Sequence, residues 1–171
     1  MFNLNNRIAN LEARIHRIAT VLNSRTAGAH IKLSPHELVE LTKISDKALD
    51  KAYGYGTSQV GSFGWKANEQ SVLHAMDIIA SGNTNIEAIA DAVHKGWNHA
   101  VYTVKDPAYK NQEIDPATGL TKGEKKYKAR LELAKKTYHS LPENEKEKDR
   151  VVARAVLEWA EENGWVGGFL P

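Results

Sequence analysis

The chain of 171 residues is long enough for one medium domain or for a small domain with extensions. It holds 23 Lys and Arg against 21 Asp and Glu, so its net charge of +2 gives no general attraction to nucleic acid or to a membrane surface. It contains no cysteine, which excludes disulfides, cysteine-based zinc sites and thiol chemistry. No apolar run approaches the roughly 20 residues that cross a bilayer, and charges interrupt the N-terminus where a signal peptide would have its apolar core. We therefore expect no membrane span and no secretion by a signal peptide.

Residues 1–25 carry a heptad pattern in which apolar residues are spaced alternately by four and three positions. The apolar positions are Leu4, Ile8, Leu11, Ile15, Ile18 and Leu22. So narrow a seam is typical of a coiled coil, because a helix packed on a globular core usually has a wider apolar face. The pattern predicts an oligomerisation helix that pairs with other copies of the chain, and packing on the chain's own body is the alternative. Residues 26–33 are expected to form a linker.

The next segment, 34–83, is expected to be helical. Ser34 and Glu37 have the spacing of a capping box, in which each side chain bonds to the other residue's backbone amide at a helix start. The helix that they open is expected to break near Ser45 and to stop at Gly54.

A loop over 53–65 follows, with four glycines and four aromatic residues. Its backbone amides could bind an anion, or its glycines could let the aromatic side chains fold back onto a neighbouring element. Beyond the loop, apolar spacing predicts a helix over 67–80.

In segment 84–164, Thr84 and Glu87 have the spacing of a second capping box. The helix after it has an apolar face made of Ile86, Ile89, Ala90, Val93, Trp97 and Val101. The turn sequence at 115–119 predicts a small β-hairpin. A last helix is expected to start at Pro142 and to end at Gly164, with Val152, Val156 and Trp159 on one face.

Between the hairpin and the last helix, residues 122–136 form a basic helix with seven Lys and Arg against two Glu. A helix of this kind can follow phosphates, but it is more often a solvated face, so the sequence does not favour nucleic acid as a partner. The tail over 165–171 is apolar and uncharged, and we expect it to dock on a neighbouring subunit.

No catalytic constellation is visible in the sequence. The seven histidines lack the spacing of a metal-ligand set, and His94 reads as a hydrogen-bonded packing residue. No serine lies in a nucleophile motif, and the carboxylates lie beside Lys and Arg on helix surfaces. We therefore expect a protein that is not an enzyme and that has no metal or cofactor.

Two blocks of the chain together resemble the RyR domain, a small module of helices and a hairpin. The module is named after the ryanodine receptor and also occurs as a single copy in bacterial and phage proteins, and this chain resembles that single-copy type. The first block has Ile89 and Ala90 followed by His94 and Trp97, and the second reads LPENEKEKDR at 141–150. The matching residues of the second block are Leu141, Pro142, Glu145, Lys146, Lys148, Asp149 and Arg150, with Gly164 closing the segment. The resemblance covers residues 86–164. It departs from the family just before Leu-Pro, where the basic helix and Tyr138-His139 replace a short His-Pro and acidic-aromatic segment.

The resemblance implies a binding or protein-interaction module without catalysis, with nucleotide-type ligands in some members. It designates the following residues as ligand or interaction residues: His94, Trp97, Lys146, Asp149 and Arg150. The positions of Asp149 and Arg150 on the helix favour a different role, in which they bind the hairpin or first helix of their own module and fix its fold.

Together these features predict a mainly α protein with an N-terminal coiled-coil helix, a helical middle segment and a C-terminal RyR-like module with an α, β-hairpin, α order. We expect a non-enzymatic bacteriophage assembly or binding protein, a virion structural component that forms homo-oligomers and contacts other virion proteins. The alternative is a soluble protein in the cytoplasm of the infected bacterial cell. That protein would bind a nucleotide or a nucleotide-derived signal through the RyR-like module.

Overall fold

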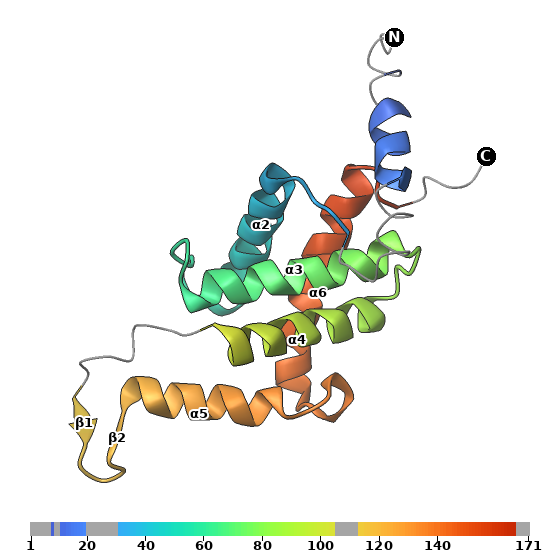
Figure 1. Cartoon of the computed structure of the whole chain (residues 1–171). Coiled ribbons are helices and arrows are strands. Elements are labelled where there is room, and N and C mark those ends of the chain that lie inside the picture. Colours follow the sequence, from blue (N-terminus) through green and yellow to red (C-terminus); the bar gives the residue numbers. More distant parts are fainter. Residues whose placement is uncertain (1–7, 9–10, 20–30, 105–112, 167–171) are drawn as a thin grey trace.

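The computed structural model describes residues 8, 11–19, 31–104 and 113–166, and these residues are mainly helical (Figure 1). Residue 8 and residues 11–19 are helical. The later helices are α2 (Pro35–Tyr53), α3 (Phe63–Ala80), α4 (Ile86–Thr103), α5 (Lys122–Ala134) and α6 (Glu143–Glu162), with a short 3-10 turn, η2 (Tyr138–Ser140). The strands β1 (Ile114–Asp115) and β2 (Leu120–Thr121) pair antiparallel. The prediction of a mainly α fold with one small hairpin is confirmed.

One hydrophobic core joins α2, α3, α4 and α6. Figure 1 shows α3 and α4 lying along each other, with α6 passing behind both, and α2 packs against α3 and α6. Fully buried side chains come from each of the four helices: Leu41, Val72, Met76, Ile79, Ile89, Val93 and Val156. The predicted segments 34–83 and 84–164 thus share one core.

The contact between α3 and α4 depends on small residues at the point where the helices approach each other most closely. A methyl group added at Gly96 would lie 2.4 Å from the carbonyl oxygen of Gln70 and 2.6 Å from the Cα of Ser71. The hydroxyl of Ser71 donates a hydrogen bond to the carbonyl of Val93, at 3.2 Å. Because only a hydrogen fits at position 96, the two backbones can come this close.

Helix α2 confirms its predicted start and stop but not the predicted break. Ser34 and Glu37 form the capping box, and Gly54 ends the helix at a φ of 65°. The break near Ser45 is wrong, because α2 is continuous and Ser45 is buried inside it. Helix α3 also begins earlier than predicted, at Phe63, where the hydroxyl of Ser62 caps the first turn.

Helix α4 begins differently from the prediction. The capping residue is Asn85, whose side chain accepts a hydrogen bond from the backbone amide of Ala88 at 3.1 Å. The capping box predicted for Thr84 and Glu87 is therefore wrong, and the carboxylate of Glu87 is bound to Arg150 of α6.

The hairpin and the last helix lie close to where the sequence places them. Strand pairing sets Ile114 opposite Thr121 and Asp115 opposite Leu120, on either side of the predicted turn. Pro142 is the residue before α6 and not its first helical residue.

Candidate interaction sites

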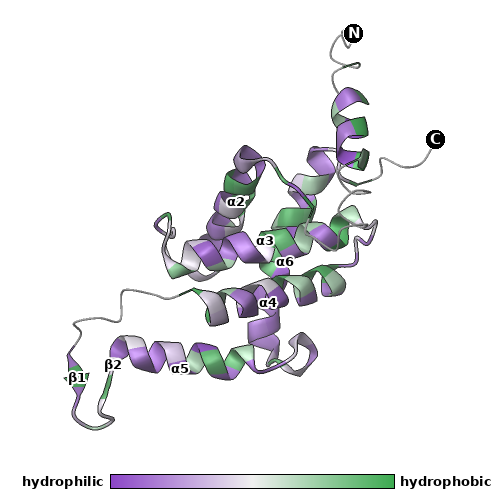
Figure 2. Cartoon of the chain, in the orientation of Figure 1, coloured by the Kyte–Doolittle hydropathy of each residue, from purple (hydrophilic) through white to green (hydrophobic). Residues whose placement is uncertain are grey.

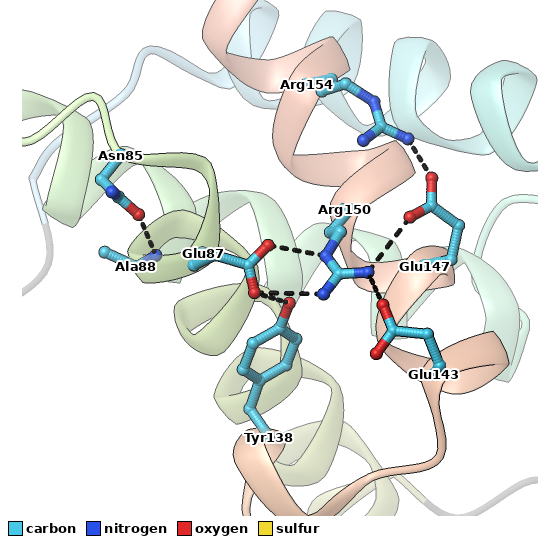
Figure 3. A network of polar contacts seen from close by, with 8 residues as sticks. All are labelled: Asn85, Glu87, Ala88, Tyr138, Glu143, Glu147, Arg150 and Arg154. Carbon is cyan, nitrogen blue, oxygen red and sulfur yellow. Dashed lines mark hydrogen bonds and ion pairs between the residues drawn. The ribbon is translucent and has the colours of Figure 1, made fainter.

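Arg150 of α6 joins three carboxylates at the contact between α6 and the start of α4 (Figure 3). Its Nε and Nη2 donate to the two oxygens of Glu87, at 2.6 and 3.2 Å, which is a bidentate pair. Its Nη1 donates to Glu143 and, at 3.3 Å, to Glu147. The hydrogen bonds to Glu87 and Glu143 raise the pKa of Arg150 above its ordinary value, so the guanidinium remains charged at any pH of interest.

Tyr138 completes this network from the η2 turn. Its hydroxyl donates to Glu87 at 2.9 Å, and its ring is buried in the core. Burial and the hydrogen bond to Glu87 raise the pKa of Tyr138 to about 12, so the hydroxyl stays protonated and acts as a donor. The hydrogen bond from Arg150 lowers the pKa of Glu87. The network therefore ties α4, η2 and α6 together through one carboxylate.

A second polar contact joins the same two helices, between His94 of α4 and Asp149 of α6. His94 is 4% exposed, and its Nδ1 lies 3.4 Å from the Asp149 carboxylate. Its Nε2 lies 2.9 Å from the carbonyl oxygen of Lys136, which can only accept, so Nε2 carries a hydrogen. If Nδ1 had no proton, its lone pair would face the carboxylate. A proton bound between Nδ1 and Asp149 removes this repulsion, so the contact favours the protonated pair.

The pKa shifts of the pair agree with a held proton. Burial disfavours the charged imidazolium, but the hydrogen bonds with Asp149 and the Lys136 carbonyl, and the charge of Asp149, outweigh it and raise the pKa of His94. Burial raises the pKa of Asp149, and the opposing effect of His94 does not cancel it. Each shift means that the folded protein binds a proton at that group more tightly than the unfolded chain does.

The other two residues designated by the RyR resemblance lie at the edges of this contact. The Trp97 ring stacks on the His94 ring, with centroids 6.0 Å apart, and packs against the smaller apolar cluster around Phe63. The Lys146 ammonium lies 5.9 Å from the centre of the Tyr138 ring. His94, Asp149 and Arg150 thus lie in the contact of α4 and α6, where Asp149 and Arg150 bind the first helix of their own segment. Trp97 and Lys146 contact His94 and Tyr138 from outside it.

Two residues of the network, Glu87 and Tyr138, are missing from the designated set. Glu87 fitted a capping box, and Tyr138 lay in the stretch where the chain departs from the RyR pattern. Glu87 and His94 are seven residues apart, so they lie on one face of α4. This spacing is the sequence signal that Glu87 belongs to the same helix contact as His94.

The seam of the N-terminal helix is exposed where the structure describes it. Ile8, Leu11 and Ile15 are 46%, 54% and 65% exposed, and Ile18 is half-buried. Leu4 and Leu22, the remaining predicted seam residues, lie outside the described residues.

Arg17 attaches this helix to the end of α6. Its guanidinium donates to the carbonyl of Asn163, at the negatively polarised C-terminal end of α6, and lies 5.4 Å from the Trp165 ring. Figure 1 shows residues 11–19 beside that end of α6. Trp165 belongs to the tail that was expected to dock on a neighbouring subunit, but it is buried in the core of its own chain. The rest of the tail, 167–171, lies outside the described residues.

Two carboxylates of α2 fix the glycine-rich loop. Asp46 accepts a hydrogen bond from the amide of Ser58, and Asp50 accepts one from the amide of Gly56, both at 2.7 Å. These two amides are therefore already bound to anionic groups of the same chain. At the loop, the rings of Tyr53 and Tyr55 stack with centroids 5.3 Å apart, and Tyr55 is exposed.

The basic helix α5 packs on the C-terminal part of α4. Figure 2 shows hydrophilic residues along the first half of α5. Several of its cations contact their own chain. Lys125 pairs with Asp115 of the hairpin, and Arg130 lies 3.9 Å from the centre of the Phe63 ring. Lys135, directly after the helix, pairs with Glu132 at 2.6 Å. The helix therefore presents less free positive charge than its composition suggests.

Within the described ranges, no group of three or more His, Asp and Glu side chains could hold a metal ion. None of the described helices has both the length and the apolar character needed to cross a membrane. The chain matches no family model, no curated protein and no solved structure.

Proposed function

We propose that this protein is a non-enzymatic assembly protein that forms homo-oligomers through its N-terminal helix and binds other proteins through its RyR-like segment. The observation that carries the proposal is the exposed row Ile8, Leu11 and Ile15 on the N-terminal helix. Arg17 attaches this helix to the body of the molecule, by which we mean the part that contains α2 to α6. Single exposed apolar side chains are common on proteins, but a row at heptad spacing favours a partner helix.

The free energy available from burying this row favours a reversible association that depends on concentration. Burying one large aliphatic side chain contributes about 1.5–3 kcal/mol, and part of that gain is lost when the partners become ordered. A helix of this length is marginal in water, so the pairing depends on protein concentration or on support from the body.

The setting that we propose is a bacteriophage particle, with the protein as a virion structural component. The likeness of residues 86–164 to single-copy RyR modules of bacterial and phage proteins supports this setting. The contacts of Asp149 and Arg150 within the fold favour it over the nucleotide-binding alternative. Side chains that stabilise the module are less available for a small ligand. Mass spectrometry of purified particles should find the chain at a copy number that fits a symmetric assembly. A nucleotide that co-purifies in near-stoichiometric amount would instead support the soluble nucleotide-binding protein.

Oligomerisation is tested by two matched substitutions in the same helix, Ile15→Asp on the seam and Ala13→Asp on the exposed side opposite. Both place an aspartate on an exposed position, so neither disturbs the core. Light scattering over a concentration series should show that the wild type and Ala13→Asp have masses above the 19.0 kDa of one chain, and that Ile15→Asp stays at that mass.

A wild type that remains at the mass of one chain at every concentration would contradict the proposal. So would equal masses for the two variants, because the seam position would then have no special role. Circular dichroism of both variants shows whether the helical content is retained.

A further inference from the structure

We infer that two N-terminal helices pair as a parallel, in-register, two-stranded coiled coil that carries both bodies at the same end. The inference rests on the proposed homo-oligomerisation and names the partner, a second copy of this chain, together with its orientation and number. It follows from the residue types on the exposed seam, from the charges beside it and from the position of the body.

The residue types on the seam fit two parallel strands. In a heptad labelled a to g, Ile8 and Ile15 occupy a positions, and Leu11 occupies the d position between them. Isoleucine at a with leucine at d favours a parallel dimer, because each side chain then packs well in the hole formed by the partner helix. Ile18, at the next d position, would favour a trimer, but it is already half-buried within its own chain.

The charges beside the seam favour the same orientation. Glu12 is at an e position and Arg14 at a g position. Arg7, which lies outside the described residues, is one heptad before Arg14 in the sequence and thus also at g. In a parallel pair a g residue faces the e residue five positions later on the partner, which sets Arg7 opposite Glu12 with opposite charges. In an antiparallel pair g residues face g residues, so arginines would face arginines.

The body leaves the seam free for a partner. Arg17, at a c position, binds the carbonyl of Asn163, and the side chains of Arg14 and Arg17 lie beside Gly164. The body thus approaches the c and g side near the C-terminal end of the helix. The a and d positions at Ile8, Leu11 and Ile15 remain exposed. Two parallel helices would therefore place both bodies at that end.

Single cysteines test the orientation cleanly because the chain has none of its own. In a parallel in-register pair the two copies of position 8 are neighbours. In an antiparallel pair that matches a to d positions, position 8 faces position 18. The two copies of position 8 are then ten residues apart along the axis, about 15 Å at the helical rise. A disulfide needs Cα atoms within about 7 Å, so it discriminates between the two arrangements.

The experiment oxidises full-length Ile8→Cys, with Ala13→Cys as the control on the outward f position of the same helix. Expected is rapid conversion of Ile8→Cys to a covalent dimer at twice 19.0 kDa, with Ala13→Cys remaining at 19.0 kDa. Light scattering of the uncrosslinked wild type should give the same doubled mass.

Three results would overturn the inference while leaving homo-oligomerisation intact. The first is a seam-dependent mass of three or more chains. The second is faster cross-linking in a mixture of Ile8→Cys and Ile18→Cys than in Ile8→Cys alone, which indicates antiparallel helices. The third is equal cross-linking of Ile8→Cys and Ala13→Cys in an oligomer that Ile15→Asp still dissociates. A wild type that is monomeric at all concentrations would instead overturn the proposed function together with the inference.

Discussion

Two adjacent residues of α6 make both polar contacts with α4. Asp149 binds His94, and Arg150 binds Glu87, which lies two helical turns before His94 on the same face of α4. Because two separated points of α4 are held by neighbouring residues, α6 is fixed in rotation as well as in position. Asp149 and Arg150 therefore have a structural role as a joint between the two helices.

The His94–Asp149 pair should make the stability of the protein depend on pH. The raised pKa of His94 means that the folded state holds a proton that the unfolded chain releases near the ordinary value of 6.5. This contribution is complete below pH 6.5 and is lost as the pH rises through the pKa of the folded state. The raised pKa of Asp149 has the same sign, but its effect begins at the ordinary value of 3.8. The free energy of unfolding should thus fall as the pH rises above 6.5.

Urea unfolding at a series of pH values measures this effect. His94→Gln should remove most of the fall, whereas His99→Gln, which removes an exposed imidazole from the same helix, should retain it. An unchanged pH dependence in His94→Gln would show that the pair does not hold the proton. At the acidic end Glu87 acts with the opposite sign, because its lowered pKa contributes stability that is lost as the pH falls through the folded value.

At the scale of the elements, the closest helix contact is the crossing of α3 and α4 at Gly96. Gly96→Ala would place a methyl group 2.4 Å from a backbone oxygen, and backbone cannot rotate away as a side chain can. The helices would have to separate, at a cost of about 1–3 kcal/mol or more in the free energy of unfolding. Chemical denaturation measures the loss.

Gly64→Ala is the matched control for this prediction. A methyl group there would lie 2.7 Å from the hydroxyl oxygen of Ser58, an end of a side chain that can turn aside. Alanine also stabilises a helix relative to glycine by about 1 kcal/mol. The control should thus cost far less than Gly96→Ala, and similar losses for the two variants would contradict the role assigned to the crossing.

Local sequence signals predicted the helices well and their polar contacts poorly. Apolar spacing and the Ser34 capping box place α2, but the break expected near Ser45 is absent. Asp46 can be buried there because it accepts hydrogen bonds from the amide of Ser58 and the side chain of Asn68, partners that lie beyond the helix. Glu87 was assigned to a local cap for the same reason, since its partner Arg150 is 63 residues away. Periodicity shows which face of a helix is apolar. It does not show which distant residue forms a hydrogen bond with a polar side chain.

At the scale of the whole molecule, the shared core has a consequence for unfolding. Leu41 of α2, Val72 of α3, Ile89 of α4 and Val156 of α6 belong to one cluster, so removing any of these helices exposes the others. We therefore expect α2, α3, α4 and α6 to unfold in a single cooperative step. Helix α5 should behave differently, because only Gly123 and Ala134 are buried in it, while Leu131 and Leu133 are half-buried.

Hydrogen exchange followed by mass spectrometry of peptides tests both parts of this expectation. In low concentrations of urea, peptides from α5 should lose protection first, through local opening. Peptides from α2 and α6 should then lose protection together, at the free energy of global unfolding. Earlier exchange of α2 and α3 than of α4 and α6 would show that residues 34–83 and 84–164 are separate cooperative units. The shared core would then be an interface between two domains, and residues 84–164 could be studied alone.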